Sequence, residues 1–306
     1  MRVIFFGTAE FAVPSLTAVA AAGHEIALCV TQPDRPKGRG LRTESSPVKR
    51  AAVHLGLPVA QPERPTAALL QPFHPELGIV IAYGRLIPRE VLAAATQGML
   101  GVHPSLLPAY RGAAPVARAI LQGETTTGVT IFRLTERLDA GAIIRQRSVP
   151  IEREEPADRL TERLAHVGAA ELVQAIGELA KGQASETPQS DAEATFAPKL
   201  TKADGWIDWA QPAHLIVRRI RAVNPWPGAM TQWRGGALKV TAAAARASSA
   251  SQAAAGTIVE AVPYRMVVAT GEGIVDITEV QPANRRRMSV REFLAGHAIR
   301  VGDTLG

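Results

Sequence analysis

The sequence predicts an α/β protein with a doubly wound, mostly parallel Rossmann-like N-terminal domain and a small C-terminal β-barrel domain that is OB-like. Three observations support this prediction. Short apolar runs alternate with helical patterns in the first half of the chain. Residues 182–198 are rich in Gly, Ser, Thr, Pro and acidic residues, as linkers are. Beyond them, short alternating segments are separated by turns that contain glycine, which is typical of antiparallel sheets.

The elements follow from these patterns in chain order. Buried parallel strands are expected at 3–6, 25–30, 58–61, 77–83 and 98–103, because their apolar runs are nearly continuous. Helices are expected at 11–23, 46–56, 65–73 and 112–124. Two strands at 126–135 and 142–151, expected to be antiparallel, precede a long amphipathic helix that starts at Ala157. The domain boundaries that we predict are 1–183, a linker at 184–204, and 205–306.

Composition excludes several classes of protein. The chain has 306 residues, of which 46% are hydrophobic and 20% charged, so global disorder is excluded. Cys29 is the only cysteine, which excludes a disulfide framework and a cysteine-rich metal site. Apolar runs are too short for a membrane span or a signal peptide. We therefore expect a cytoplasmic protein of bacterial type that carries no targeting segment.

The positive charge is concentrated near the C-terminus. The net charge is +6, and residues 200–306 contain 13 Lys and Arg against 8 Asp and Glu. Such a surplus favours a polyanionic partner such as nucleic acid, and the alternative is a merely basic soluble surface.

His103 is the first candidate catalytic residue. It ends a predicted strand, and ligands of open parallel sheets bind outside the carboxyl ends of strands. A histidine there can exchange a proton near neutral pH, and its imidazolium form can donate to an oxyanion. Asp139 lies in a predicted turn between two strands, and a nearby carboxylate would raise the pKa of His103 and orient its ring. On their own, the two residues also fit a structural histidine and an ordinary turn residue.

Two further segments bear on the kind of ligand. The first strand is followed by Gly7 but lacks the spaced glycines of a dinucleotide site, so a hydride-transferring dehydrogenase is disfavoured. Residues 33–40, PDRPKGRG, form a basic loop that cannot build a core, and it is either a mobile phosphate-contacting segment or a solvated surface loop. Its cationic residues, with the one just beyond it, are Arg35, Lys37, Arg39 and Arg42.

Eight motifs in order resemble one family. They are FFGTAEFA, TQPDRPKGRG, SPVK, IAYGRLIP, HPSLLPAYRGAAP, TGVTIFRLTERLDAGAI, KLTKADGWIDW and RAVNPWPG. Together they closely resemble the methionyl-tRNA formyltransferases, within the 10-formyltetrahydrofolate-dependent formyltransferases. The strong motifs run from residue 1 to about 230. The basic loop and the two motifs beyond the linker point to the tRNA-modifying member rather than to the glycinamide ribonucleotide formyltransferases.

The resemblance implies a reaction in protein biosynthesis. The formyl group of 10-formyltetrahydrofolate, a co-substrate, would pass to the α-amine of methionine on initiator Met-tRNA for translation initiation. In the family, an Asn–x–His pair and an Asp carry the chemistry, and these match Gly101, His103 and Asp139. His103 would stabilise the oxyanion and assist proton transfer, while Asp139 would tune and orient His103.

The resemblance also implies the binding residues. Arg39 matches the tip of the loop that contacts tRNA, and Arg111 would help to shape the approach to the acceptor. The folate-binding residues implied are Ile81, Ala82, Tyr83, Gly84, Arg85, Leu86, Ile87, Pro88, Ser105, Leu106, Leu107, Pro108, Leu138 and Asp139. No metal is expected, because the histidines show no ligand spacing. A monomer is expected.

Gly101 is a departure from the family. Glycine lacks the carboxamide that donates to the formyl oxygen, and losing one such donor costs about 10²–10³ in rate. The chain would then be a substituted variant of an active enzyme, a natural enzyme of reduced rate in which water or a neighbour fills the gap, or a tRNA-binding relative without turnover. A formyltransferase acting on a small amine is a further alternative.

Overall fold

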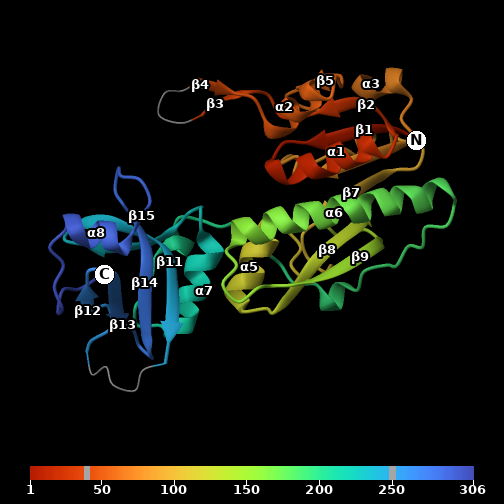
Figure 1. Cartoon of the computed structure of the whole chain (residues 1–306). Helices are drawn as coiled ribbons and strands as arrows, with labels where there is room; N and C mark the ends of the chain where they lie inside the picture. The colour runs from red at the N-terminus through yellow and green to blue at the C-terminus, as the bar shows by residue number, and fades with distance from the viewer. Residues whose placement is uncertain (38–41, 248–252) are drawn as a thin grey trace. The chain divides into compact units, whose positions relative to one another are not determined.

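The computed structural model describes residues 1–37, 42–247 and 253–306. These residues form two compact units, and each is described by itself (Figure 1). The first unit comprises 1–115, 126–150 and 161–197. The second comprises 116–125, 151–160 and 198–306. Two internal segments therefore belong with the C-terminal unit.

The first unit contains a seven-stranded sheet. Its order is β5-β2-β1-β6-β7-β8-β9. The strands are β1 (Arg2–Gly7), β2 (Glu25–Val30), β5 (Val59–Ala60), β6 (Leu77–Ile81), β7 (Met99–His103), β8 (Thr126–Arg133) and β9 (Ile143–Pro150). The first five strands along this order are parallel, and β8 and β9 add to the sheet antiparallel. The predicted doubly wound, mostly parallel sheet is confirmed, as is the antiparallel pair.

The helices predicted at 11–23, at 46–56 and from Ala157 are present in the first unit, and helical segments at 89–92 and 191–193 were not predicted. The helical elements of this unit are η1 (Glu10–Ala12), α1 (Val13–Ala21), α2 (Pro47–His54), α3 (Ala67–Leu70), η2 (Gln71–Phe73), α4 (Arg89–Leu92), α6 (Ala157–Ala180, which begins in the second unit) and η3 (Asp191–Glu193). The prediction of a single helix at 65–73 is wrong. This segment is divided into α3 and η2, because Pro72 has no N–H with which to continue an α-helix.

The strand register decides which face of the sheet carries the candidate site. Val80 of β6 pairs with Gly101 of β7, so both side-chain positions lie on one face, and His103 lies on that face two residues later. Val102 therefore points to the opposite face. A Cβ atom built on Gly168 of α6 would lie 2.8 Å from Val102, so α6 packs closely on that opposite face (Figure 1).

A hydrophobic cluster fills the site's face of the sheet. It joins β1, β2 and the start of β7 to α3 and α4. Its buried members are Ile4, Phe6, Leu28, Val30, Leu70, Tyr83, Val91 and Met99. The core ends beside Gly101, so the candidate site borders packed side chains on this face.

A short hairpin forms within the basic segment. Its strands are β3 (Arg35–Lys37) and β4 (Arg42–Glu44), which pair antiparallel. Asp34, just before it, accepts from Lys49 at 2.5 Å and from Gln61 at 2.7 Å. The side chains of Lys49 and Gln61 therefore fix the base of the segment to the first unit.

The second unit contains an antiparallel sheet of order β10-β11-β14-β13-β12, with β15 on β14. Its elements are α5 (Pro115–Gln122, which begins at the last residue of the first unit's first segment), η4 (Ala203–Gly205), α7 (Ala213–Val223), β10 (Ala229–Trp233), β11 (Gly236–Arg246), β12 (Ile258–Val262), β13 (Arg265–Ala269), β14 (Ile274–Pro282), β15 (Met288–Ser289) and α8 (Val290–Gly296). Ser289 and Glu292 form a capping box that starts α8. The predicted separate antiparallel sheet is confirmed.

The last residues of the chain lie between the two edges of this sheet. Gly306 N–H donates to the carbonyl of Gln232 in β10 at 3.0 Å. Leu305 N–H donates to the carbonyl of Gly256, next to β12, at 2.8 Å. The tail thus satisfies backbone groups at both edges, as a closed barrel does.

Among the helices that the structure describes, none combines the length and the apolar character needed to cross a membrane.

Candidate active site

His103 ends β7 and is buried, with 7% of its side chain exposed. Its Nε2 atom lies 2.8 Å from the carbonyl oxygen of Tyr110. Because a carbonyl only accepts hydrogen bonds, Nε2 carries the proton of the neutral ring. Nδ1 is then the basic atom of His103.

Asp139 faces that basic atom. Its Oδ2 lies 3.7 Å from Nδ1 of His103, and it accepts the backbone N–H of Gly112 at 2.8 Å. Gly112 has a φ of 124°, and a Cβ atom there would lie 2.7 Å from the carbonyl oxygen of Ala197. Only glycine suits this position, so the hydrogen bond to Asp139 depends on the glycine backbone.

The turn that carries Asp139 folds back along β7. Leu134 N–H, just after β8, donates to the carbonyl of Met99 at the start of β7. Asp139 nevertheless reaches His103 at the other end of β7. Asp139 itself has a φ of 49°, in the left-handed region. This reversal brings together two residues that the strand order alone places at opposite ends of β7.

Burial sets the charge of His103. Removal from water lowers the pKa of His103 below its usual value of about 6.5, while the charge of Asp139 and the hydrogen bond to Tyr110 oppose that shift. Since burial is the largest effect, the ring is neutral at neutral pH. A neutral ring with its proton on Nε2 is suited to accept a proton at Nδ1, and it has no N–H at Nδ1 to offer to an oxyanion.

The space beside Gly101 is filled by apolar side chains. Gly101 is buried and pairs with Phe132 across the antiparallel ladder. A Cβ atom on Gly101 would lie 2.6 Å from the Phe132 ring and 2.7 Å from Leu134. The Phe132 ring also meets the His103 ring edge to face at 6.5 Å between centroids. A side chain at 101 would therefore meet Phe132 and Leu134 already at its Cβ atom.

The segment 81–88 begins at the carboxyl end of β6, next to β7. Ile81 and Tyr83 are buried, and Tyr83 packs edge to face on Phe6 in the core. The carbonyl of Tyr83 accepts from Thr8 and Gln32, which fixes the loop. Leu86 is 85% exposed. Among the predicted folate contacts here, Ile81 and Tyr83 would therefore act through the backbone, and Leu86 through its side chain.

The segment 105–108 is held by polar contacts. Thr130 of β8 donates its hydroxyl to the carbonyl of Ser105 and accepts the N–H of Leu107. Gln146 of β9 donates to the carbonyl of Leu107 at 2.7 Å. Leu107 itself is buried, and Leu138 on the Asp139 turn is 58% exposed. A rigid loop after His103 and an exposed leucine beside Asp139 thus flank the pair.

The structure describes only part of the predicted tRNA contacts. Arg35 is exposed at the start of β3. Arg39 lies outside the described residues. Lys37 and Arg42 are placed in β3 and β4 by their backbones alone. These contacts stay predictions.

Arg111 is buried on the loop after His103. Its side chain is 3% exposed and donates to Gln189 at 2.8 and 3.0 Å and to Asp191 at 2.9 Å. Its role in shaping the approach to the methionine acceptor stays a prediction. The composition of 182–198 resembles a linker, so nothing in the sequence pointed to Gln189 or Asp191 as partners of a buried arginine.

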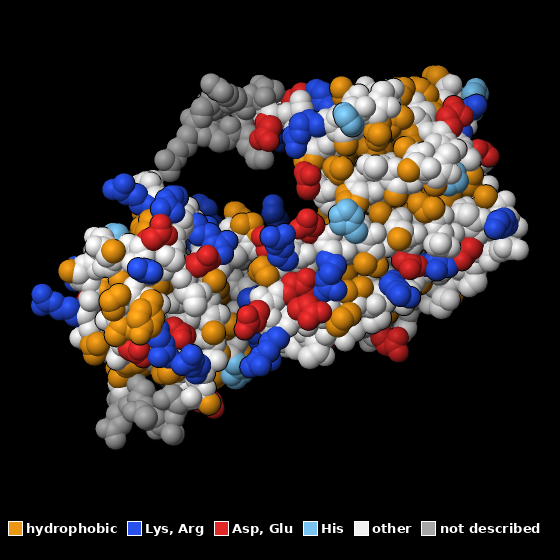
Figure 2. Space-filling view, in the orientation of Figure 1, with side chains coloured by type: hydrophobic (Ala, Val, Ile, Leu, Met, Phe, Trp, Pro, Cys, Tyr) orange, Lys and Arg blue, Asp and Glu red, His pale blue; other side chains and the backbone are white. Residues whose placement is uncertain are grey.

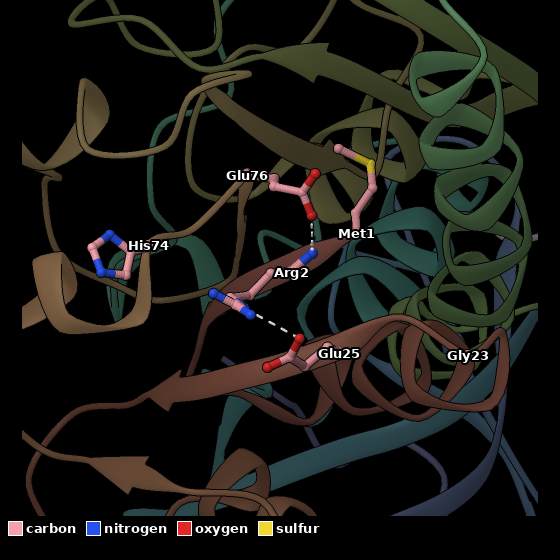
Figure 3. A pocket seen from close by; sticks show the side chains of 6 residues that line it. All are labelled: Met1, Arg2, Gly23, Glu25, His74 and Glu76. Carbon is pink, nitrogen blue, oxygen red and sulfur yellow. Dashed lines mark hydrogen bonds and ion pairs between the residues drawn. The ribbon is translucent and has the colours of Figure 1, made fainter.

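A pocket that the structure contains lies elsewhere (Figure 3). It is lined by Met1, Arg2, Gly23, Glu25, His74 and Glu76. Arg2 begins β1, Glu25 begins β2, and Glu76 immediately precedes β6. These are the amino ends of parallel strands, whereas His103 is at a carboxyl end. The pocket is therefore separate from the candidate site.

Both parts of the chain match known sequence families. Residues 1–176 match the family described as formyl transferase, and residues 199–298 match the family described as formyl transferase, C-terminal domain. A methionyl-tRNA formyltransferase of Moorella thermoacetica is 44% identical over 310 residues, covering 100% of this chain and 99% of the relative. One from Chloroflexus aurantiacus is 46% identical over 310 residues, covering 99% of this chain and all of the relative.

Solved structures share the fold at low sequence identity. HypX from Aquifex aeolicus in complex with tetrahydrofolic acid has a TM-score of 0.68 at 19% identity, covering 96% of this chain and 47% of that one. An N-formyltransferase from Helicobacter canadensis in complex with folinic acid and dTDP-3-aminofucose has a TM-score of 0.69 at 16% identity, covering 92% and 99%.

Proposed function

The chain belongs to the methionyl-tRNA formyltransferase family, and on that premise we propose that it formylates the α-amine of methionine on initiator Met-tRNA, with 10-formyltetrahydrofolate as donor. The observation that carries the proposal is the His103–Asp139 pair, which lies beside the loop 105–108 at the carboxyl end of β7. Relatives named methionyl-tRNA formyltransferase match over their whole length, which supports this acceptor over a small amine.

The reaction needs one proton to be moved. A bond forms between the methionine nitrogen and the formyl carbon, and the bond from that carbon to the folate nitrogen breaks. The attacking nitrogen loses a proton and the leaving nitrogen gains one. We assign this transfer to Nδ1 of His103, which is the basic atom of a neutral ring.

Asp139 supports that transfer electrostatically. When Nδ1 takes the proton, the imidazolium faces the Asp139 carboxylate at 3.7 Å, and opposite charges at this distance attract. The protonated Nδ1 can first donate a hydrogen bond to the oxyanion, and it then gives its proton to the leaving nitrogen as the carbon–nitrogen bond breaks. In this account His103 first acts as a base, and its oxyanion role follows from the proton that it has taken.

Gly101 makes the enzyme slower than its relatives in this account. The carboxamide that the family places here would have contributed about 10²–10³ in rate. Phe132 and Leu134 lie 2.6 and 2.7 Å from where a Cβ atom at 101 would stand. We favour an active enzyme of reduced rate over a tRNA-binding relative without turnover, because His103, Asp139 and the other motifs of the family are present.

The folate donor fits the residues around the pair. The exposed side chains of Leu86 and Leu138 offer apolar surface, and the loop that contains Ala82 and Gly84, with φ values of 45° and 80°, bends at the end of β6. We propose that this loop holds the pterin edge through its backbone. The 105–108 loop and the Asp139 turn complete the folate-binding residues.

The tRNA is the proposed partner of the basic residues. Residues 200–306 carry a net charge of +5, and Figure 2 shows Lys and Arg side chains spread over the visible face among acidic ones. Phosphate contacts from such residues would position the tRNA. We propose that residues 205–306 and the basic segment with Arg35, Lys37, Arg39 and Arg42 supply these contacts. The chain would act as a cytoplasmic monomer, with a catalytic domain at 1–183 and a linker at 184–204.

Acceptor choice tests the proposal. The full chain is supplied with 10-formyltetrahydrofolate and, in parallel, initiator Met-tRNA, free methionine, an amino sugar nucleotide or glycinamide ribonucleotide. We expect formylation of Met-tRNA alone. Formylation of a small amine at a higher kcat/KM would favour the alternative. Truncation at residue 200 is a poor substitute for this test, because 116–125 and 151–160 belong with the C-terminal unit.

A further inference from the structure

The segment 187–197 contacts both loops that hold the catalytic pair. Thr195 accepts the N–H of Tyr110 at 2.8 Å, and Tyr110 is the residue whose carbonyl accepts from His103. The backbone N–H of Ala197 donates to the carbonyl of Arg111 at 2.7 Å. On the other side, the backbones of Thr187 and Ile143 exchange two hydrogen bonds of 2.8 Å. The segment therefore spans from the His103 loop to the end of the Asp139 turn.

Gln189 stands between these two attachments. Its Nε2 donates to the carbonyls of Asp139 at 2.9 Å and Gly141 at 2.7 Å. Its Oε1 accepts from Nε and Nη2 of the Arg111 guanidinium. Carbonyls only accept and a guanidinium only donates, so both ends of the amide are fixed by partners that have no alternative role.

Arg111 is held by more than Gln189. Its third contact is with Oδ1 of Asp191, while Oδ2 of Asp191 accepts from Arg137, which lies on the Asp139 turn. The two guanidinium groups hold the pKa of Asp191 below its usual range. Asp191 is half exposed and Gln189 is partly buried, whereas Arg111 is buried.

The turn that carries Asp139 depends on the hydrogen bonds from Gln189. Asp139 has a φ of 49°, in the left-handed region, and a non-glycine residue keeps this conformation where its surroundings fix it. The two hydrogen bonds from Gln189 are to carbonyls on either side of Ala140, at the point where the turn presents the Asp139 carboxylate to His103.

We propose that Gln189 is a positioning residue for formyl transfer, whose side-chain amide joins the buried Arg111 to the turn and so sets the position of the Asp139 carboxylate relative to His103. This inference rests on the proposed function for its kinetic consequence. Gln189 does not touch the reacting atoms in this account; it acts through Asp139.

The test replaces Gln189 by Glu. A carboxylate keeps the acceptor for Arg111 but cannot donate to the carbonyls of Asp139 and Gly141, so the link to the turn is replaced by repulsion between oxygen atoms. We expect kcat to fall by about 10- to 100-fold, as misplacement of a catalytic group does. KM for both substrates and the melting temperature should stay close to those of the parent. The matched control is Gln183→Glu, the same exchange at an exposed position that precedes the segment 187–197.

A second readout is independent of turnover. In protein that is isotope-labelled at histidine, the NMR signal of the His103 ring is identified by its loss in His103→Gln. We expect this signal to move in Gln189→Glu and to stay in place in Gln183→Glu. If the parent shows no formylation, the proposed function fails, and the His103 signal alone decides the positioning role. An unmoved signal, or an unchanged kcat in an active parent, overturns the inference. A fall in kcat that merely follows a loss of folded protein, with the signal in place, also overturns it.

Discussion

Nδ1 of His103 lies 3.7 Å from Oδ2 of Asp139, although the strands that lead to them run in opposite directions. The Gly112 amide holds Asp139 from one side, and the Tyr110 carbonyl holds His103 from the other. These contacts leave Nδ1 as the basic atom and place a carboxylate where its proton would be stabilised. The chemistry that we assign to the chain follows from this relationship.

The pH dependence of activity should reflect the buried ring. Burial lowers the pKa of His103, so its basic form persists below the value of about 6.5 that is usual for histidine. The limb for His103 is read from kcat at saturating substrates, because kcat/KM also reflects protonation of the free methionine amine, and we expect kcat to fall only at a pH below about 6.5. A profile of kcat against pH in the parent measures this, and an acid limb of kcat above pH 6.5 would contradict a neutral buried His103.

The free energy of unfolding should depend on the protonation of His103. The unfolded chain binds a proton at His103 more tightly than the folded chain does, because the folded pKa is the lower one. The resulting contribution to stability is therefore fully present above about pH 6.5 and is lost as the pH falls towards the folded pKa. Denaturant unfolding of the parent and of His103→Gln between pH 5 and pH 8 would show the parent losing more stability on the acid side.

Replacing Asp139 by Asn should separate charge from geometry. The Asn oxygen can still accept the Gly112 N–H, but the negative charge that raises the pKa of His103 is removed. We expect the acid limb to move to lower pH and kcat to fall by about 10²-fold. The control is Asp158→Asn, at an exposed carboxylate. An acid limb that stays in place would show that Asp139 does not act on His103 electrostatically.

Much of this site could be predicted from the sequence. The apolar run before His103 indicated a strand end, and Asp139 stood between two predicted strands. The fold-back of the Asp139 turn could not be predicted, because it depends on contacts with Gly112 and Gln189, 27 and 50 residues away along the chain. Long-range hydrogen bonds of this kind leave no periodic trace in a sequence.

The composition of residues 182–198 did not indicate the contacts that they make. Residues 182–198 have the small and polar residues of a linker, and these same residues make backbone and side-chain contacts with the His103 loop. Hydrophobic periodicity gives no signal for these contacts, because the segment is held by hydrogen bonds, including those from the buried Arg111 guanidinium. The contacts of Arg111 with Gln189 and Asp191 were accordingly not predicted.

Restoring a donor at residue 101 should raise the rate at some cost in stability. Gly101→Asn supplies the missing carboxamide, and we expect kcat to rise by up to about 10²–10³ with little change in folate affinity. The new side chain must displace Phe132 and Leu134, and such overpacking costs about 1–3 kcal/mol.

Gly101→Ala is the matched control for that variant. It introduces the same Cβ contacts without a donor, so it should share the loss of stability and show no gain in kcat. Formylation rates and unfolding free energies of the two variants and the parent decide the matter. An Asn variant that is folded and no faster than the parent would contradict the missing-donor argument.

The thiol of Cys29 should be inert in the folded protein. Cys29 is fully buried in β2, and burial raises the pKa of its thiol to about 12. Thiolate is the reactive form, so alkylation at pH 8 should be very slow until denaturant is added. The rate of modification followed by mass spectrometry measures this. Rapid labelling of native protein would contradict the burial of β2 in the sheet.

Formylation of initiator Met-tRNA by the parent and by His103→Gln tests the central claim most directly. With 10-formyltetrahydrofolate as donor, we predict that the parent forms formyl-Met-tRNA and that His103→Gln is slower by about 10²–10⁴-fold. His54→Gln, at an exposed histidine, should match the parent. A His103→Gln variant as fast as the parent, or no product from either the parent or Gly101→Asn, would contradict the account.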